Sequence, residues 1–243
     1  MATLYVVATP IGNLEDMTLR ALRVLKEVDV VVAEDTRRTR KLLAHYQINK
    51  TILPLHERSS LREEEKIVAL LATSTIAYVV DSGTPGISDP GASFVAKVLA
   101  TYGNDAKVIP IPGASAMSTL VSVADAPMRH FVFLGFLPKK KGKQTMLKEI
   151  AASSYPVMFF ESPHRIIKTL KELRSLGEFS LIVGRELTKT FETIYRGGSE
   201  EVIERLEKEG VRGEFTVLAF NKGKTQSAKG KTTMQNLKFF NRF

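Results

Sequence analysis

Cysteine is absent from the 243-residue sequence, which excludes a disulfide framework and any metal site built from thiolates. The four histidines, His45, His56, His130 and His164, show no zinc-binding spacing, so no metal is expected. No run approaches the roughly 18 apolar residues that span a bilayer. The N-terminus, MATLYVVATP, lacks the basic start and cleavage site of a secretory signal. These absences predict a soluble, cytoplasmic protein with no membrane partner.

Three common ligand-binding and catalytic motifs are also missing. The sequence has no GxGxxG, which argues against a dinucleotide-binding Rossmann site. It has no GxxxxGK(S/T), which argues against a phosphate-binding P-loop, and no GxSxG, the turn that presents a nucleophilic serine. Any ligand must therefore be held by other means.

The composition itself is that of a globular, basic protein. Hydrophobic residues make up 44% of the chain, enough for one large domain or two modest ones. The 35 Lys and Arg exceed the 26 Asp and Glu, which gives a net charge of +9. Excess positive charge favours polyanionic partners such as nucleic acid, although many basic proteins bind none.

The most informative stretch is DSGTPGISDPG, residues 81–91. It follows TIAYVV, residues 75–80, whose apolar, β-branched and aromatic residues predict a buried parallel strand. Asp89 and Pro90 are expected to be the N-cap and first-turn residue of a helix over 92–100. The loop is either a tight strand-to-helix connection or a ligand loop of the kind found at strand ends in α/β sheets.

Strand and helix patterns alternate through the first half of the chain, which predicts an α/β domain with a mainly parallel sheet. The expected strands are residues 3–8, 28–33, 51–55, 75–80 and 107–111. Asp16 is expected to cap the first helix, in which Leu19, Leu22 and Leu25 are expected to be buried. Thr36 is expected to cap the second helix, and Ser60 and Glu63 to form a capping box at the start of the third.

Three loops that contain Gly or Pro, residues 9–13, 83–88 and 112–115, follow predicted strands and are expected to converge on one crevice. They contain no Lys or Arg, so a neutral or zwitterionic ligand fits them better than a phosphate-rich one.

Residues 125–127, Asp-Ala-Pro, read as a linker, after which the spacing of the elements changes. We expect an N-terminal α/β domain over 1–126 and a smaller α+β domain over 127–222. Residues 223–243 are predicted to be a basic, poorly ordered tail.

Basic residues flank the predicted crevice in four clusters, and each cluster alone is most simply a solvated face. Together they favour a polyanion surface, and the glycine-containing loop 136–143 suits an irregular RNA. The simplest interpretation of each carboxylate at a loop end is a helix cap or a member of an ion pair. For His164 three roles stay open: a contact to phosphate, a catalytic base or a helix cap. The basic residues are Arg37, Arg38, Arg40, Lys41, Lys139, Lys140, Lys141, Lys143, Arg165, Arg185 and Lys189, with His164; the carboxylates are Glu34, Asp35, Asp81, Glu161 and Glu186.

Seven segments in order resemble one known family. They are TPIGNLEDMTLRA, AEDTRRTRKLL, GTPGISDPG, IPGASA, GFLPKKKGK, FFESPHR and RELTKTFE, and they extend from residue 1 to about residue 220. The chain is similar to the ribosomal RNA small-subunit methyltransferase I family of the tetrapyrrole-methylase-like superfamily of S-adenosylmethionine enzymes. The resemblance implies a two-domain fold with S-adenosylmethionine in the cleft between the domains, and commonly a homodimer.

The implied reaction is methylation of a cytidine ribose 2′-hydroxyl in the decoding region of 16S rRNA, on the RNA or the small ribosomal subunit. The resemblance assigns cofactor contacts to Pro10, Ile11, Gly83, Thr84, Pro85, Gly86, Ile87, Ser115 and Ala116, and from the second domain to Glu161, Leu187 and Phe215. Residues implied to face RNA are Arg37, Arg38, Lys139, Lys140, Lys141, Lys143, His164, Arg165, Arg185 and Lys189.

Because a ribose hydroxyl is a poor nucleophile, a base is expected to help, and Asp35 and Glu161 are the candidates. Two other functions stay open: a sister methyltransferase acting on a small tetrapyrrole or a protein residue, and a non-catalytic RNA-binding protein of ribosome assembly. Members of the family often carry a further helical segment after the second domain, and nothing in the sequence after residue 223 resembles it.

Overall fold

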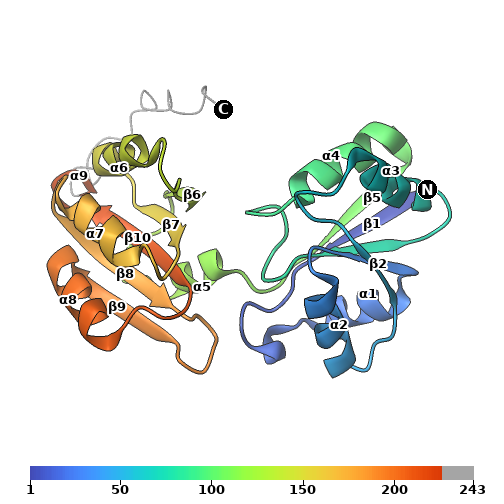
Figure 1. Cartoon of the computed structure of the whole chain (residues 1–243), viewed down its shortest axis with the longest axis horizontal. Helices are drawn as coiled ribbons and strands as arrows, with labels where there is room; N and C mark the ends of the chain where they lie inside the picture. The colour runs from blue at the N-terminus through green and yellow to red at the C-terminus, as the bar shows by residue number, and fades with distance from the viewer. Residues whose placement is uncertain (226–243) are drawn as a thin grey trace. The chain divides into compact units, whose positions relative to one another are not determined.

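The structure is a computed structural model that describes residues 1–225, so most of the predicted tail at 223–243 lies outside the described residues. By its internal contacts the chain forms two units (Figure 1). Unit 1 is Met1–Thr119 with Leu187–Thr190, and unit 2 is Leu120–Glu186 with the chain from Phe191 onward. The predicted start of the second domain, residue 127, lies seven residues after Leu120, the start of unit 2.

Unit 1 is built on five parallel strands in the order β3-β2-β4-β1-β5, which confirms the predicted parallel sheet. The strands are β1 (Ala2–Val7), β2 (Val30–Ala33), β3 (Thr51–Pro54), β4 (Ile76–Val79) and β5 (Ala106–Ile111). Strand β4 is buried on both faces because helices cover both sides of the sheet.

The helices α1 (Leu19–Glu27) and α2 (Thr36–His45) pack on one face of this sheet, through Val24, Leu25 and Leu43. The helices α3 (Leu61–Leu70) and α4 (Gly91–Tyr102) pack on the other, where Phe94 lies against Tyr78. The short helices η1 (Leu14–Asp16), η2 (Gly103–Asp105) and α5 (Ala116–Ser122) complete the connections.

Two helix starts differ from the sequence prediction, and the predicted capping box does not. Asp16 lies in η1, and Thr18 is the N-cap of α1, where its side chain accepts a hydrogen bond from the backbone N–H of Ala21. Leu19 is the first residue of α1 and is 86% exposed, against the prediction, whereas Leu25 is buried as predicted, together with Ala21 and Val24. Asp35 rather than Thr36 caps α2, whereas the box of Ser60 and Glu63 on α3 is confirmed.

Unit 2 contains a mixed sheet in the order β6-β7-β10-β8-β9, in which only β6 and β7 are parallel. The strands are β6 (Val132–Phe136), β7 (Val157–Glu161), β8 (Phe179–Arg185), β9 (Thr193–Gly198) and β10 (Phe215–Asn221). The helices are α6 (Lys143–Ala152), α7 (Ile166–Arg174), α8 (Ser199–Glu209) and α9 (Lys222–Thr225). The predicted α+β class is confirmed.

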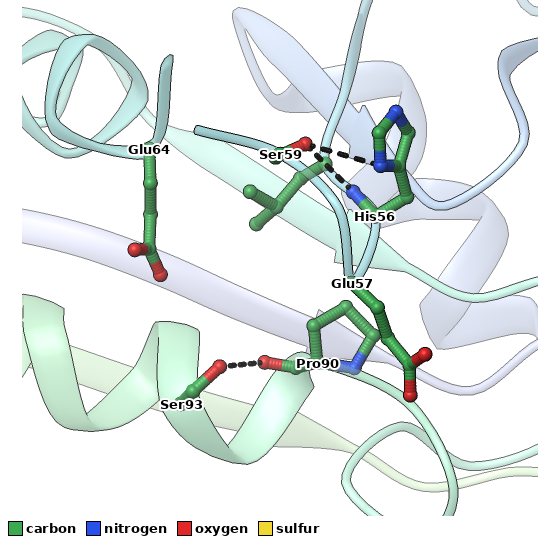
Figure 2. A pocket seen from close by; sticks show the side chains of 7 residues that line it. His56, Glu57, Ser59, Glu64, Pro90 and Ser93 are labelled. Carbon is green, nitrogen blue, oxygen red and sulfur yellow. Dashed lines mark hydrogen bonds between the residues drawn. The ribbon is translucent and has the colours of Figure 1, made fainter. Parts of the chain in front are cut away.

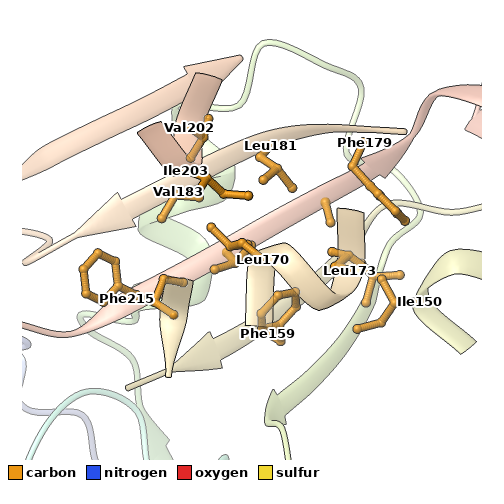
Figure 3. Close-up of a cluster of buried hydrophobic side chains, with 14 of the residues drawn as sticks. Ile150, Phe159, Leu170, Leu173, Phe179, Leu181, Val183, Val202, Ile203 and Phe215 are labelled. Atoms are coloured by element: carbon orange, nitrogen blue, oxygen red, sulfur yellow. The ribbon is translucent and has the colours of Figure 1, made fainter. Parts of the chain in front are cut away.

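One face of the unit 2 sheet carries the core of this unit (Figure 3). Leu170 and Leu173 of α7 and Ile203 of α8 pack onto Phe159 of β7 and Phe215 of β10. This packing holds α7 on the sheet, and Arg165, just before α7, contacts the basic loop between β6 and α6 described below.

Candidate functional site

The loops after β4, β1 and β5 meet because these three strands are neighbours in the sheet. Thr9 and Gly83 exchange two backbone hydrogen bonds, of 2.9 and 3.1 Å between N and O. The Thr84 hydroxyl donates to the backbone oxygen of Ala114 at 3.1 Å and so links the loop after β4 to the loop after β5. The predicted convergence of the three loops is therefore confirmed within unit 1.

Two glycines allow the backbones of these loops to approach closely. Gly83 has φ of +82°, and a Cβ there would lie 3.2 Å from Cγ2 of Ile11. A Cβ on Gly113 would lie only 2.9 Å from the Cβ of Ala8. The edge of the sheet is thus formed largely by backbone, which lets a ligand come close to main-chain groups.

Asp89 does not cap α4 as predicted; Pro90 occupies the N-cap position without a side-chain hydrogen bond. The Asp89 carboxylate instead accepts hydrogen bonds from the backbone N–H groups of Gly86, Ile87 and Gly91, at 2.8, 3.2 and 2.8 Å. It also accepts one from the Tyr78 hydroxyl at 3.4 Å. A carboxylate has enough acceptor sites for all four donors, so Asp89 holds the 83–88 loop in one conformation.

Asp35 and Asp81 connect the start of α2 to the loop after β4. Asp81 accepts a hydrogen bond from the backbone N–H of Asp35 at 3.1 Å and forms an ion pair with Arg38 at 3.3 Å. Asp35 caps α2 through the backbone N–H of Arg37 at 2.8 Å. Hydrogen bonds from the Arg37 side chain and backbone lower the pKa of Asp35 to about 2. Asp35 is thus a helix cap and Asp81 a member of an ion pair, which are the two simple roles that the sequence suggested for such carboxylates.

Acidic side chains gather on the β2–β4 side of this edge. Burial, followed by the charge of Asp81, raises the pKa of Glu34 above its usual value. Burial, followed by the charge of Asp89, raises the pKa of Tyr78. The Tyr78 hydroxyl therefore stays protonated at neutral pH and serves as a hydrogen-bond donor to Asp89.

Two hollows lie in unit 1. One, of about 440 Å³, is shown in Figure 2, where the Ser93 hydroxyl donates to the Pro90 oxygen at 2.8 Å and the backbone N–H of His56 donates to the Ser59 hydroxyl at 3.1 Å. No motif in the sequence indicates this hollow. The second, along α2, contains the basic cluster that the sequence did indicate. The first is lined by Leu55, His56, Glu57, Ser59, Glu64, Pro90 and Ser93, the second by Asp35, Arg37, Arg38, Arg40, Lys41 and Ala44.

The remaining cofactor residues inferred from the resemblance are Glu161, the last residue of β7, Leu187, which follows β8, and Phe215, the first residue of β10. Glu161 and Phe215 stand opposite each other in the β7–β10 pair, and both side chains are buried inside unit 2. Leu187 groups by its contacts with unit 1, not with the second domain as expected. Both Glu161 and Phe215 are almost fully buried, at 1% and 2% exposure, so unit 2 by itself does not present either side chain to a ligand.

The basic residues expected to face RNA divide into two sets. Arg37, Arg38, Lys139, Lys140, Lys141 and His164 are exposed. Lys143 is wrong as an RNA contact, because its side chain is 8% exposed and forms an ion pair with Glu172. Arg165 is 20% exposed and is paired with Glu161, and Arg185 donates hydrogen bonds to the Arg212 oxygen and the Tyr195 hydroxyl. Lys189 is partly buried.

Two kinds of site have no support in the part of the chain that the structure describes. Within residues 1–225 no group of three or more His, Asp or Glu is arranged to hold a metal ion. No helix in the same range has the length and apolarity needed to cross a bilayer.

The family model for Tetrapyrrole (Corrin/Porphyrin) Methylases matches residues 3–203. The chain is 41% identical to ribosomal RNA small subunit methyltransferase I of Thermotoga maritima, over 91% of this chain and 100% of that protein. It is 42% identical to the protein of the same name from Halalkalibacterium halodurans, over 91% and 76% of the two chains.

Among solved structures, uroporphyrin-III C-methyltransferase from Thermus thermophilus in complex with S-adenosylhomocysteine has a similar fold. Its TM-score is 0.60 at 21% identity, over 89% of this chain and 96% of that one. The family match and the identity over most of the chain agree. The chain therefore belongs to the tetrapyrrole methylase family and, within it, groups with ribosomal RNA small subunit methyltransferase I.

Proposed function

We propose that this protein binds S-adenosylmethionine at the three convergent loops of unit 1 and transfers its methyl group to ribosomal RNA. One observation carries this proposal: three linked loops without Lys or Arg, at the edge of a parallel sheet, lie in a chain about 41% identical to a ribosomal RNA methyltransferase. The similarly folded uroporphyrin-III C-methyltransferase, which was solved with S-adenosylhomocysteine, supports the choice of cofactor.

The residues present fit this cofactor. The loops expose main chain at Gly12, Gly86 and Gly113 and carry no Lys or Arg, which suits a zwitterionic amino acid joined to a neutral nucleoside. When bound, S-adenosylmethionine supplies a methyl group already activated on a sulfonium. The residues proposed to hold it are Pro10, Ile11, Gly83, Thr84, Pro85, Gly86, Ile87, Ser115 and Ala116, with Glu161, Leu187 and Phe215.

The proposed acceptor is a cytidine ribose 2′-hydroxyl of 16S rRNA, free or in the small ribosomal subunit. The relatives are named as small-subunit ribosomal RNA methyltransferases, which supports the RNA. The exposed basic residues of α2 and of the loop before α6 supply a surface for phosphates. A homodimer acting in the cytoplasm is part of the same proposal.

Asp35 is the proposed base for the ribose hydroxyl. Its side chain is 25% exposed at the start of the basic helix α2. Glu161, the other candidate, is buried, with hydrogen bonds to both oxygens from Ser162 and Thr169 and an ion pair with Arg165. Both oxygens of Asp35 also accept hydrogen bonds, from Arg37, so the difference lies in exposure. Since a base must reach the proton that it removes, the exposure of Asp35 favours it over Glu161.

The test uses purified protein, S-adenosylmethionine with a labelled methyl group, and small ribosomal subunits from cells that lack the enzyme. The RNA is digested and its nucleosides are identified by mass. Label in 2′-O-methylcytidine is expected. No label in RNA with cofactor binding intact would indicate a different acceptor, such as a tetrapyrrole or a protein. Loss of cofactor binding as well would indicate a non-catalytic RNA-binding protein.

A pair of variants links this activity to the three loops. Asp89→Ala removes the carboxylate that orders the 83–88 loop, and Asp105→Ala removes an exposed carboxylate from η2 of the same unit. Methylation is expected to fall in Asp89→Ala and to stay at the wild-type rate in Asp105→Ala. Equal rates in both variants would place the cofactor elsewhere.

A further inference from the structure

The exposed residues Lys139, Lys140 and Lys141 lie in a short connection between β6 and α6, residues 138–142, which we name the lysine loop. The loop ends at Gly142, whose φ of +87° turns the chain into α6. Three adjacent ammonium groups on one loop form a strong site for phosphates only if the loop is held in place, because ordering a free loop opposes binding.

The first end of the lysine loop is held by Arg165. Its guanidinium donates to the backbone oxygens of Leu137 and Pro138, at 3.0 and 3.2 Å. The same guanidinium pairs with Glu161 at 2.6 Å, and Glu161 is only 1% exposed. The hydroxyl of Thr169 donates to the other Glu161 oxygen at 2.7 Å. All the charges of this network face inward or toward the loop backbone.

The second end of the lysine loop is held by Lys143, the first residue of α6. Its ammonium lies 2.8 Å from Glu172, and the two side chains are 8% and 23% exposed. The backbone N–H of Lys143 donates to the oxygen of Lys140 at 3.2 Å, which closes the turn. Lys143 is therefore basic in sequence but directed away from solvent.

Both anchors use the same helix. Arg165, Thr169 and Glu172 are spaced by four and three residues, which places them on one side of α7 and the turn before it. Lys168 belongs to the same helix and is 77% exposed. A buried ion pair is costly to form and stabilises a fold little more than apolar residues would. Because two such pairs hold the two ends of the lysine loop, we infer that the function of the loop requires one fixed conformation.

We propose that Arg165 and Lys143 are positioning residues that fix the lysine loop for binding to the phosphates of RNA, without touching RNA themselves. This inference rests on the proposed function, because it takes RNA as the partner of the loop. It assigns the phosphate contacts of this segment to Lys139, Lys140 and Lys141 alone. It replaces the expectation that all basic residues of this region face the substrate.

Salt dependence distinguishes a positioning residue from a contact residue. Each phosphate neutralised by a lysine releases counterions and contributes about 0.7 to 0.9 to the slope of log K against log salt. Removing a contact therefore lowers the slope. Removing an anchor leaves the same contacts available on a looser loop, so the affinity falls at every salt concentration and the slope is kept.

The experiment measures binding of small ribosomal subunits that lack the modification to the full-length protein between 50 and 300 mM KCl. The anchor variants are Lys143→Met and Arg165→Lys, the latter because Lys can pair with Glu161 but cannot also span two backbone oxygens. The contact variant replaces Lys139, Lys140 and Lys141 by Ala. The matched control is Lys148→Met, which removes the same charge from an exposed position of α6.

Each anchor variant is expected to bind about five- to tenfold more weakly at every salt concentration, as loss of preorganisation predicts, with the wild-type slope. Its KM for subunits rises by the same factor, and kcat at saturation is kept. The triple variant is expected to lower the slope by about two to three. Lys148→Met is expected to behave as the wild type.

A slope lowered by about one in Lys143→Met would overturn the inference, since it would show a phosphate contact. Wild-type affinity in both anchor variants would also overturn it. If Lys143→Met does not fold, the variant Lys143→Met with Glu172→Met removes both buried charges and is expected to show the same weaker binding. Wild-type binding by the triple variant, or none by the wild type, would instead reject RNA docking itself.

Discussion

The carboxylate of Asp89 accepts the backbone N–H of Gly86 with both oxygens, at 3.0 and 2.8 Å. This relationship orders the turn at Gly86, in the proposed cofactor loop, five residues before the start of α4. Asp89→Asn replaces one acceptor oxygen by a donor and sets an N–H against another N–H.

We expect Asp89→Asn to raise the Kd for S-adenosylmethionine about tenfold or more, because the loop loses its fixed conformation. Stability should fall by about 1 to 3 kcal/mol, the usual result of an unpaired group in a partly buried place. Calorimetric titration and thermal unfolding measure the two effects. Asp105→Asn on the exposed η2 is the control, and an unchanged Kd in Asp89→Asn would remove the loop from the cofactor site.

Thr9 provides a second clamp, between β1 and β4. Its hydroxyl, which is 2% exposed, donates to the Val80 oxygen at 3.0 Å. Thr9→Val has nearly the same shape and leaves that oxygen without its donor, so the free energy of unfolding should fall by about 1 to 3 kcal/mol. Thr9→Ser keeps the hydroxyl and should lose less. Denaturant unfolding of both variants checks this, and equal losses would show that the methyl group matters instead.

Gly113 and Ala8 test the close approach of the loops after β5 and β1. Gly113→Ala places a methyl group 2.9 Å from the Cβ of Ala8, which should destabilise unit 1 by about 1 to 3 kcal/mol. Ala8→Gly in the same chain removes the opposing methyl group and should recover part of that loss. Unfolding of the two single variants and the double variant gives the coupling, and strictly additive losses would contradict a direct clash.

The sequence predicted the strands of unit 1 well because buried parallel strands are short, continuous apolar runs. It placed the start of α1 too early, since Asp16 and Thr18 are both good N-cap residues and only packing selects between them. Leu19 was predicted to be buried and is exposed, whereas Ala21 and Val24 pack on the sheet with Leu25. Which side of a helix is buried depends on its packing, which the local sequence indicates only in part.

At the site, the convergence of the three loops could be predicted from their positions after the strands of one sheet. The roles of the charged residues could not be predicted in this way. Asp89 was expected at a helix cap and instead binds the loop before it. Lys143 belongs to a basic run but pairs with Glu172, 29 residues later in the chain. Such pairings depend on the fold of distant segments, so a charge run in the sequence cannot reveal which of its members is buried.

Glu34 predicts a dependence of stability on pH. Burial and the neighbouring carboxylates Asp81, Asp89 and Glu57 raise its pKa in the folded protein above the ordinary value of 4.5. The folded state then holds a proton on Glu34 at pH values where the unfolded state has released it. This group therefore opposes folding at neutral pH, and its penalty disappears as the pH falls through the raised pKa and then toward 4.5.

Glu34→Gln should accordingly be slightly more stable than the wild type at pH 7, with the difference shrinking toward pH 4.5. Thermal unfolding of both proteins between pH 4.5 and 8 measures it. Glu65→Gln on α3, which is 65% exposed, is the control and should show a smaller change. A difference for Glu34→Gln that grows as the pH falls would have the wrong sign and would contradict the raised pKa.

Asp35 predicts the pH dependence of the reaction. With a pKa of about 2 it is fully ionised at every pH where the protein can be assayed, so its use as the base predicts a kcat that is flat from pH 5 to 8.

The variant Asp35→Ser keeps an N-cap for α2 but removes the carboxylate. We expect kcat to fall about a hundredfold, at the low end for a general base, because a carboxylate of low pKa is a weak proton acceptor. Single-turnover methylation rates of the wild type and of Asp35→Ser, measured from pH 5 to 8, test both predictions. A rate that rises tenfold per pH unit, or an Asp35→Ser rate within a few fold of the wild type, would mean that another group, or alignment alone, activates the hydroxyl.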